Sequence, residues 1–181
     1  MSFFILVHGK VSPYTFEYLD DNSPVRLERT LIHTDRPKGK SKETHESISR
    51  EVFAIELMSK DLAKLSPAAT IKDARKLMEE RKISHIPLTI DNLLVGLVSS
   101  KDLLPFVNPG GEGTRLDKCM ARLVLCASEE TPLRHIAEVF LKENINSLPI
   151  VDRDFLVTGI ITNRDLIRWL LTMNKFQKEM K

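Results

Sequence analysis

The chain has little cysteine and no excess of charge of either sign. Cys119 and Cys126 are the only cysteines among 181 residues. Two thiols are too few for a disulfide framework, and they lack the paired spacing of a metal knuckle. Lysine and arginine number 27 against 25 for aspartate and glutamate, a net charge of +2. This balance gives no basic footprint for a nucleic acid, so a nucleic-acid partner is not expected.

Long hydrophobic runs and catalytic histidine patterns are missing as well. The apolar run at 3–7 has no basic region before it, and it is too short for a signal-peptide core or a membrane span. The five histidines fall in no metal-binding or catalytic-triad spacing. We therefore expect a cytoplasmic protein with no membrane segment, no metal site, no catalytic residues and no enzymatic activity of its own.

Two further segments are predicted to be linkers. The run at 36–42 alternates basic residues with proline, glycine and serine, which is typical of a solvated linker. The segment 109–114 is rich in glycine, but it lacks the Gly-Lys-Ser/Thr ending of a phosphate-binding loop.

An internal repeat organises the rest of the chain. The block ISHIPL at 83–88 returns as INSLPI at 145–150, so Pro87 and Pro149 are 62 residues apart. The block GLVSSKDL at 96–103 returns as GIITNRDL at 159–166 with an offset of 63. One residue has therefore been inserted between the two blocks of the second copy. Matched blocks in the same order predict two structurally similar units.

Each copy is predicted to contain two helices, the second of which closes it. The first helix starts at Thr70, which has N-cap chemistry with Asp73 three residues later, and its counterpart starts near Thr131. A closing helix is predicted to start at Ser99 in the first copy and at Thr162 in the second. Met58, Met120 and the stripe around Phe140 are expected to pack in the core.

Two short strands are predicted between the helices of each copy. They are rich in β-branched residues and bounded by turn residues, Asp91-Asn92 in the first copy and Arg153-Asp154 in the second. The predicted strands are 85–90 and 93–98, then 147–151 and 155–161.

The predicted fold class is α/β (α+β), with two units of strand–helix–strand–strand–helix. A unit of about 60 residues is too small to cover its own sheet, so the two are expected to pack as a pseudo-two-fold pair. The predicted organisation is a β-rich extension and linker at 1–45, a first repeat at 46–108 and a second repeat at 109–181. Within the extension, 3–8, 14–18 and 25–33 are candidate strands, with Gly9, Pro13 and Pro24 at turns.

The duplicated pattern resembles a known family. An apolar residue before proline, a hairpin, and then Gly-apolar-apolar-Ser/Thr-x-x-Asp, found twice between about 53 and 171, is similar to a tandem pair of CBS domains. The resemblance implies a regulatory module that binds AMP, ADP, ATP, S-adenosylmethionine or cyclic dinucleotides in clefts between the repeats. It also implies a homodimer of modules and a regulated partner protein, and it gives Thr70 a place among the ligand contacts.

The second block of each copy has the chemistry to hold a phosphorylated sugar. Ser99 and Thr162 are predicted at helix starts, where free N–H groups and partial positive charge favour a phosphate. Lys101 and Arg164 would add full positive charge there. An ionised carboxylate only accepts hydrogen bonds, so it would bind the two ribose hydroxyls and face away from the phosphate. The carboxylates in question are Asp102 and Asp165.

The first block of each copy is predicted to form the wall beside the adenine. Proline lacks an N–H group and interrupts strand pairing, which leaves neighbouring backbone groups free to contact a base edge. Ile83, Ile86, Ile145 and Leu148 are expected to pack on the ring, and a protonated His85 would favour a phosphate. The wall residues are Ser84, His85, Ile86 and Pro87 in the first copy, and Asn146, Ser147, Leu148 and Pro149 in the second.

Other interpretations of these motifs stay open. Ser/Thr-x-x-Asp is also a helix-capping pattern, which would suit a structural dimerisation module with empty clefts. The amino-terminal segment could instead make the chain an adaptor for a partner protein. The copies also differ at corresponding positions. Thr89-Ile90 of the first copy corresponds to Val151-Asp152 of the second, and Pro132 of the second copy stands where the first has Thr70. The sequence leaves open which cleft is occupied.

Overall fold

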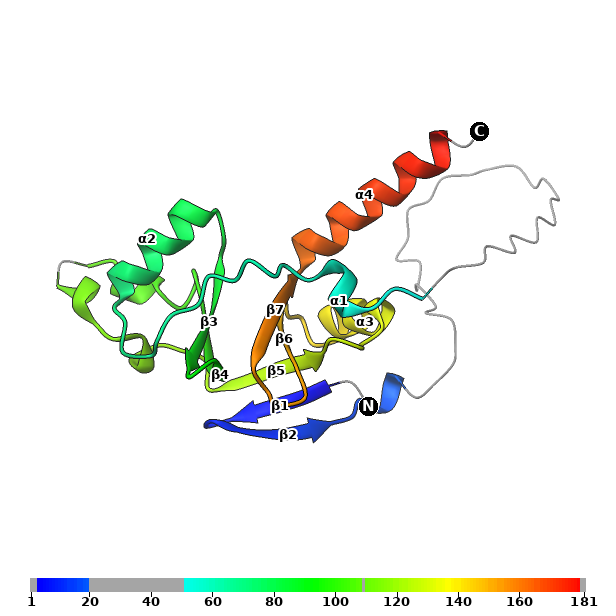
Figure 1. Cartoon of the computed structure of the whole chain (residues 1–181). Coiled ribbons are helices and arrows are strands. Elements are labelled where there is room, and N and C mark those ends of the chain that lie inside the picture. The colour runs from blue at the N-terminus through cyan, green and yellow to red at the C-terminus, as the bar shows by residue number, and fades with distance from the viewer. Residues whose placement is uncertain (1–2, 20–50, 109, 180–181) are drawn as a thin grey trace, which may run out of the picture.

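The chain folds into two sheets with helices packed against them (Figure 1). The computed structural model describes residues 3–19, 51–108 and 110–179, with side chains to residue 173. One sheet has five strands in the order β2-β1-β5-β6-β7, and the other pairs β3 with β4. The predicted mixed α/β class is confirmed.

The first repeat contains α1 (Ala54–Leu57), α2 (Ile71–Arg81), β3 (His85–Ile90) and β4 (Leu93–Ser99). The Thr70 hydroxyl accepts a hydrogen bond from the Asp73 N–H at 3.2 Å, and Asp73 Oδ2 accepts from the Thr70 N–H at 2.9 Å. This reciprocal capping box explains why α2 begins there. Asp91 and Asn92 both have positive φ, 50° and 70°, as a two-residue hairpin turn requires.

The second repeat contains β5 (Leu123–Ser128), α3 (Leu133–Lys142), β6 (Ser147–Val151), β7 (Val157–Thr162) and α4 (Asn163–Glu179). The loop between β6 and β7 contains the inserted residue, and the Asp152 side chain stabilises this loop. Asp152 Oδ1 accepts hydrogen bonds from the N–H groups of Asp154 and Leu156, both at 2.9 Å. The predicted strand at 155–161 therefore starts two residues late, because Phe155 has a left-handed φ of 61°.

The closing helix predicted from Ser99 is wrong for the first repeat. Residues 100–103 form turns, and a short 3₁₀ helix, η2 (Leu104–Phe106), follows them. Pro105 has no N–H to bond the Lys101 carbonyl, as an α-helix would need there. The chain instead makes i→i+3 bonds, such as the Leu104 N–H to the Lys101 carbonyl at 3.2 Å. The opening strand of this repeat is also reduced, to a single bridge from Leu65 to Leu88.

The connection between the repeats is short and irregular. It contains the 3₁₀ helices η3 (Gly111–Gly113) and η4 (Leu116–Lys118). It runs beside α2, where the Ile71 N–H donates to the Thr114 carbonyl at 2.9 Å. It therefore covers the end of α2 that carries Thr70.

The amino-terminal segment extends the sheet of the second repeat. Strand β1 (Phe3–Val7) pairs antiparallel with both β2 (Lys10–Tyr14) and β5, and η1 (Glu17–Leu19) follows. Gly9 lies in the turn as predicted, whereas Pro13 lies within β2 and 14–18 is not a separate strand. The candidate strand at 25–33 and Pro24 lie outside the described residues.

Each repeat sends its leading segment onto the other repeat. The backbone of Ser59 exchanges two hydrogen bonds with Ile160, at 2.9 and 3.3 Å, and that of Ala121 exchanges two with Leu97, at 2.8 and 3.1 Å. These pairs correspond under the repeat offsets, so the pseudo-two-fold arrangement is visible at the level of single bonds. Because each leading segment pairs with a strand of the other repeat, residues of both repeats surround the spaces that lie between the repeats.

Glycine makes this exchange possible. A Cβ on Gly159 would lie 2.3 Å from Met58 Sδ, and one on Gly96 would lie 2.7 Å from Met120 Sδ. Each methionine therefore packs directly on the glycine of the other repeat. The prediction that Met58 belongs to the core is confirmed, since it is buried beside Ile161 and Phe140.

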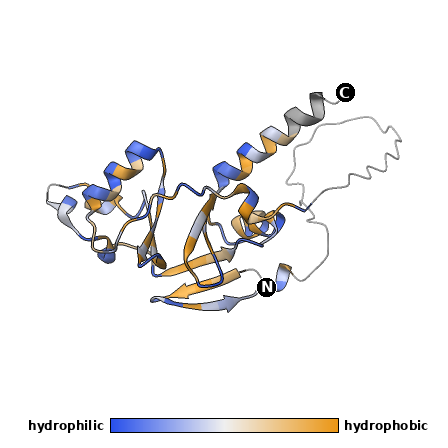
Figure 2. Ribbon diagram, in the orientation of Figure 1, coloured by the Kyte–Doolittle hydropathy of each residue, from blue (hydrophilic) through white to orange (hydrophobic). Residues whose placement is uncertain are grey.

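Strands β1, β5 and β7 contain many hydrophobic residues, as the ribbon colours of Figure 2 show. Each repeat has a core of its own. A third cluster joins them, in which Leu6 of β1 packs with Leu94 of the first repeat and with Val124 and Val157 of the second. The amino-terminal strand therefore helps to fix how the repeats sit on one another, which in turn shapes the spaces between them.

Candidate ligand-binding clefts

Two clefts lie between the repeats and correspond under the pseudo-two-fold. Cleft 1, of about 590 Å³, contains Thr162, Arg164 and Asp165 of the second repeat. Cleft 2, of about 510 Å³, contains Ser99, Lys101 and Asp102 of the first. Both volumes are in the range of small-molecule sites. The two copies of the Ser/Thr-x-x-Asp block therefore lie in two different clefts.

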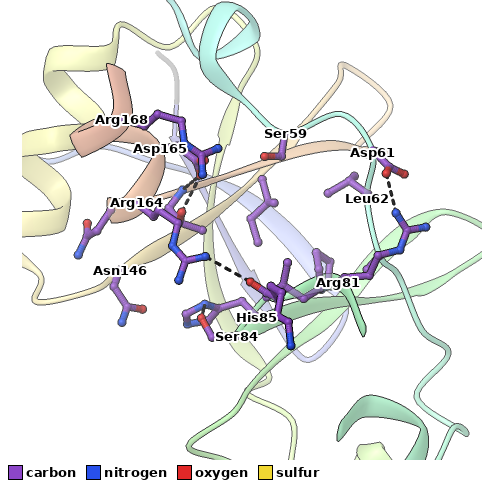
Figure 3. A pocket seen from close by; sticks show the side chains of 17 residues that line it. Ser59, Asp61, Leu62, Arg81, Ser84, His85, Asn146, Arg164, Asp165 and Arg168 are labelled. Carbon is purple, nitrogen blue, oxygen red and sulfur yellow. Dashed lines mark hydrogen bonds and ion pairs between the residues drawn. The ribbon is translucent and has the colours of Figure 1, made fainter. Parts of the chain in front are cut away.

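The clefts share one wall. Ser84, His85 and Asn146 line both of them. In Figure 3, Ser84 and His85 lie across cleft 1 from Asp165 and Arg168. Residues from the first block of each copy thus line a cleft together with the second block of a repeat.

In each cleft the aspartate is held by its own serine or threonine. The N–H and hydroxyl of Thr162 both donate to Asp165 Oδ2, at 2.8 and 2.6 Å. Ser99 does the same to Asp102 Oδ2, at 2.7 and 2.7 Å. Within the described part of the chain, Oδ1 of either aspartate accepts no hydrogen bond. A carboxylate oxygen has two lone pairs, so this free oxygen can accept two hydroxyl groups from a ligand.

The start of α4 offers fewer free backbone groups than the sequence suggests. Asp165 takes the Thr162 N–H, and the Asn146 carbonyl accepts from the Asn163 N–H at 3.1 Å. The matching group in cleft 2, the Ser100 N–H, is bonded to the Ser84 carbonyl at 2.9 Å. A phosphate would therefore depend more on side-chain cations than on helix N–H groups.

Cleft 1 is rich in cationic side chains. Arg164 reaches from α4 to the first repeat, where it donates to the Lys82 carbonyl at 3.3 Å (Figure 3). Arg81 forms an ion pair with Asp61 at 2.6 Å, and Arg168 also lines the cleft. Among the described residues, no ion pair involves Lys82, Arg164 or Arg168.

Burial sets the charge of His85. Desolvation lowers the pKa of His85 below its ordinary value, while a hydrogen bond with Asn146 and the charge of Asp102 oppose this effect. Ser84 Oγ lies 3.1 Å from His85 Nδ1. The imidazole is therefore mainly neutral at pH 7, and it can serve as a hydrogen-bonding group at the shared wall.

Several predicted contacts do not line either cleft. Ile86 and Leu148 have no exposed surface and lie in the two cores, so neither packs on a bound ring. Pro149 is buried, although its counterpart Pro87 does line cleft 1. Thr70 caps α2 beside the inter-repeat connection, away from both clefts.

Other lining residues were not anticipated. The cations Arg81, Lys82 and Arg168 of cleft 1 lie at a helix end or one turn into α4, where a charged residue is ordinarily a solvated surface residue. Ser59 and Leu62 come from the leading segment of the first repeat and reach cleft 1 only because the leads are exchanged. The repeat offset of 62 pairs Leu62 with Val124, which lines cleft 2. This pairing could be found in the sequence, but it does not indicate that either residue lines a cleft.

The described residues contain no cluster of three or more His, Cys, Asp or Glu suited to a metal ion. None of their helices combines the length and the apolar character that crossing a bilayer needs.

Comparison with known sequences identifies a repeated domain. The CBS domain matches residues 53–108 and again 116–172, which together make up more than half of the chain. An inosine-5′-monophosphate dehydrogenase from Thermoplasma acidophilum is 34% identical over 137 residues, which cover 76% of this chain and 27% of the dehydrogenase. A homoserine O-acetyltransferase from Methanohalobium evestigatum is 31% identical over 117 residues, 24% of its length. The chain thus spans about a quarter of these relatives.

Solved structures of similar fold include pairs of the same domain with bound ligands. The CBS domain pair of protein MJ0100, in complex with 5′-methylthioadenosine and S-adenosyl-L-methionine, is 26% identical with a TM-score of 0.63, covering 68% of this chain and 99% of that one. CBSX2 in complex with AMP is 27% identical with a TM-score of 0.61, covering 67% and 98%. A putative acetoin utilization protein from Vibrio cholerae is 30% identical with a TM-score of 0.64, covering 72% and 98%.

Proposed function

The chain belongs to the CBS-domain family, and we propose that it is a regulatory module that binds an adenine nucleotide or a related adenosyl ligand between its repeats. Ligand occupancy would then alter the surface offered to a regulated partner protein. Two relatives of known structure bind such compounds, AMP in one case and 5′-methylthioadenosine with S-adenosylmethionine in the other. The proposal includes no catalytic role for the chain.

One observation carries the proposal. In each cleft a lining carboxylate is fixed through Oδ2 by the preceding Ser or Thr, which leaves Oδ1 without a protein partner in the described chain. A ribose presents two adjacent hydroxyl donors, which match the two lone pairs of that oxygen. The residues of the shared wall offer polar groups for a base edge, and Ile83 and Ile145 offer apolar surface beside them.

Ligand-induced stabilisation tests the proposal directly. AMP, ADP, ATP and S-adenosylmethionine should be added separately while thermal unfolding is followed. A ligand at a hundredfold excess over its dissociation constant adds about 2.7 kcal/mol to the free energy of unfolding. Asp102→Ala and Asp165→Ala should each reduce or abolish this gain for at least one of these ligands.

Asp73→Ala is the matched control, because Asp73 makes the same capping contacts with Thr70 but lies outside both clefts. It should lose about 1 kcal/mol of stability, as expected for a cap, and keep the full ligand effect. The proposal fails if no adenosine compound stabilises the wild-type protein, or if both cleft variants respond to ligand as the wild type does.

A structural role as a homodimer is a second candidate, and an exposed apolar stripe favours it. Ile167, Leu170 and Leu171 lie at i, i+3 and i+4 on α4, which projects away from the sheets (Figure 1). Leu104 and Val107 of the first repeat, also exposed, correspond to Ile167 and Leu170 under the offset of 63. A surface with pseudo-two-fold symmetry suits a second copy of the same chain as its partner.

A further inference from the structure

We infer that the two clefts select different members of the proposed ligand class: cleft 1 takes ligands that carry phosphate, and cleft 2 takes adenosine compounds that carry none. This inference rests on the proposed function. It adds an assignment of ligand chemistry to each cleft, which the repeated sequence motif by itself does not give.

The charges of cleft 1 favour an anion. Lys82, Arg164 and Arg168 have no carboxylate partner among the described residues, while the nearby Arg81 and Asp61 neutralise each other at 2.6 Å. Figure 3 shows Asp61, Arg81, Arg164 and Arg168 around one space, with the last two on α4. Guanidinium groups bind phosphate oxygens through charge-assisted hydrogen bonds. Three cations of cleft 1 therefore have no ion-pair partner among the described residues, and the one carboxylate of the cleft outside the Arg81–Asp61 pair is that of Asp165.

The pseudo-two-fold shows which of these charges cleft 2 has lost. Lys82 corresponds to Asn144, and Arg81 to Glu143, with the offset of 62. Arg168 corresponds to Pro105 with the offset of 63. Only Arg164 has a cationic counterpart, Lys101. Lys101 and Asp102 are the charged lysine and aspartate of cleft 2, so their charges sum to zero, whereas the lysine, arginines and aspartates that line cleft 1 leave an excess of positive charge.

The remaining wall of cleft 2 is largely aliphatic. Leu123, which lines it, occupies the position of Asp61 in cleft 1. A phosphate placed here would lose hydration and would find a single cation, Lys101, beside the Asp102 carboxylate, whereas cleft 1 offers three cations that have no ion-pair partner among the described residues. A nucleoside or a thioether loses little by the same transfer. The other aliphatic residues of this wall are Leu97, Val124, Leu125 and Ile145.

The backbone at the two clefts supports the same assignment of ligands. α4 has 17 residues, and its amino-terminal end, with the positive end of the helix dipole, lies at cleft 1. No α-helix follows Ser99 at cleft 2, because Pro105 allows only turns and the three-residue η2 there. The side-chain charges and the helix therefore both distinguish cleft 1 from cleft 2.

Isothermal titration with one cleft disabled at a time tests the inference. Asp102→Ala leaves cleft 1 intact, and this variant should bind ADP at least about tenfold more tightly than adenosine, as expected when charged hydrogen bonds are added. Asp165→Ala leaves cleft 2 intact, and this variant should bind adenosine or 5′-methylthioadenosine at least as tightly as ADP. Arg168→Gln in the Asp102→Ala background should weaken ADP binding about tenfold and leave adenosine binding unchanged.

Arg75→Gln is the matched charge control, since Arg75 is an exposed arginine paired with Glu112 outside both clefts. It should change neither affinity. Equal preferences in the two clefts, the reverse preference, or an effect of Arg168→Gln on adenosine as large as that on ADP would overturn the inference while leaving the proposed function in place. If the wild type binds none of these compounds, the proposed function itself fails.

Discussion

Single residues in the repeated motif combine a structural and a ligand-directed property. Asp102 and Asp165 stabilise the backbone at the end of a strand through Oδ2, while Oδ1 accepts no hydrogen bond from the described residues and is available to a ligand. Capping and ligand binding are therefore compatible interpretations of Ser/Thr-x-x-Asp. Thr70 and Asp73 show the same capping geometry with no cleft beside them. The position of the motif relative to the other repeat, rather than the motif itself, separates the two cases.

Gly159 gives a sharp prediction at this scale. An alanine Cβ there would meet Met58 Sδ at 2.3 Å and Met58 Cβ at 2.9 Å. Gly159→Ala should lower the free energy of unfolding by about 1–3 kcal/mol, because overpacking forces the leading segment away from β7. Urea denaturation measures this change.

Gly113→Ala is the matched control for Gly159→Ala, because a Cβ at Gly113 meets nothing within 4 Å and its φ is not left-handed. Its stability should be unchanged or slightly higher, since alanine restricts the unfolded chain. In a Met58→Ala background, Gly159→Ala should cost less than in the wild type. An equal cost in both backgrounds would show that the Met58 contact does not set the effect.

His85 predicts a dependence of stability on pH. Desolvation lowers the pKa of His85 in the folded protein below the ordinary value of 6.5, and the unfolded chain restores that value. The unfolded state then binds the proton more readily, so the free energy of unfolding should decrease as the pH falls below about 6.5. Urea denaturation of the ligand-free protein at about pH 7.5 and about pH 5.5 measures the decrease.

His85→Gln should reduce this pH dependence but not remove it. Desolvation also lowers the pKa of His135, so a residual decrease of the same sign remains. His135→Gln is therefore the companion variant. An unchanged pH dependence in His85→Gln would exclude His85 as a contributor.

At the scale of elements, the amino-terminal hairpin is part of the second repeat's sheet. Strand β1 covers the edge of β5, and Phe4 stacks edge-on against Phe155 with ring centroids 5.2 Å apart. An uncovered strand edge is a site for unwanted pairing with other chains, and β1 removes it. The sequence indicated short strands here, but it did not indicate their partner.

Leu6 tests the importance of this hairpin. It has no exposed surface, and it packs among residues of both repeats. Leu6→Ala should lower the free energy of unfolding by about 2–5 kcal/mol, because it leaves a cavity where the repeats meet. Val7→Ala, at the next and exposed position of the same strand, should change it by less than about 0.5 kcal/mol. Similar costs for the two variants would mean that β1 contributes only its backbone pairing.

At the scale of the whole molecule, the exposed stripe of α4 predicts a homodimer. Leu170→Glu should give a monomer by sedimentation equilibrium, because a charge replaces apolar surface at the proposed interface. Leu141→Glu is the control, as Leu141 is an exposed leucine on α3, and this variant should remain dimeric. A monomeric wild type, or a dimeric Leu170→Glu variant, would contradict the proposed interface.

Much of the architecture follows from local sequence alone. The duplicated blocks, the Asp91-Asn92 turn and the Thr70 cap depend on residues close together in the chain, so their patterns are directly readable. The absence of a closing helix after Ser99 also has a local cause, Pro105, which the repeat pattern concealed. The sequence thus determined two similar units, their order of elements and the chemistry of the Ser/Thr-x-x-Asp block.

Only the tertiary structure decided which surfaces face each other. Ser59 reaches Ile160 across about a hundred residues of sequence, and Arg164 meets Lys82 across 82. Contacts between residues so far apart in the chain produce no periodic pattern in the sequence, because they depend on how the packed repeats are oriented. The unequal charges of the clefts arise from this packing: the sequence presents Lys82 and Arg168 as ordinary surface residues, and the packing of the two repeats brings them to one cleft.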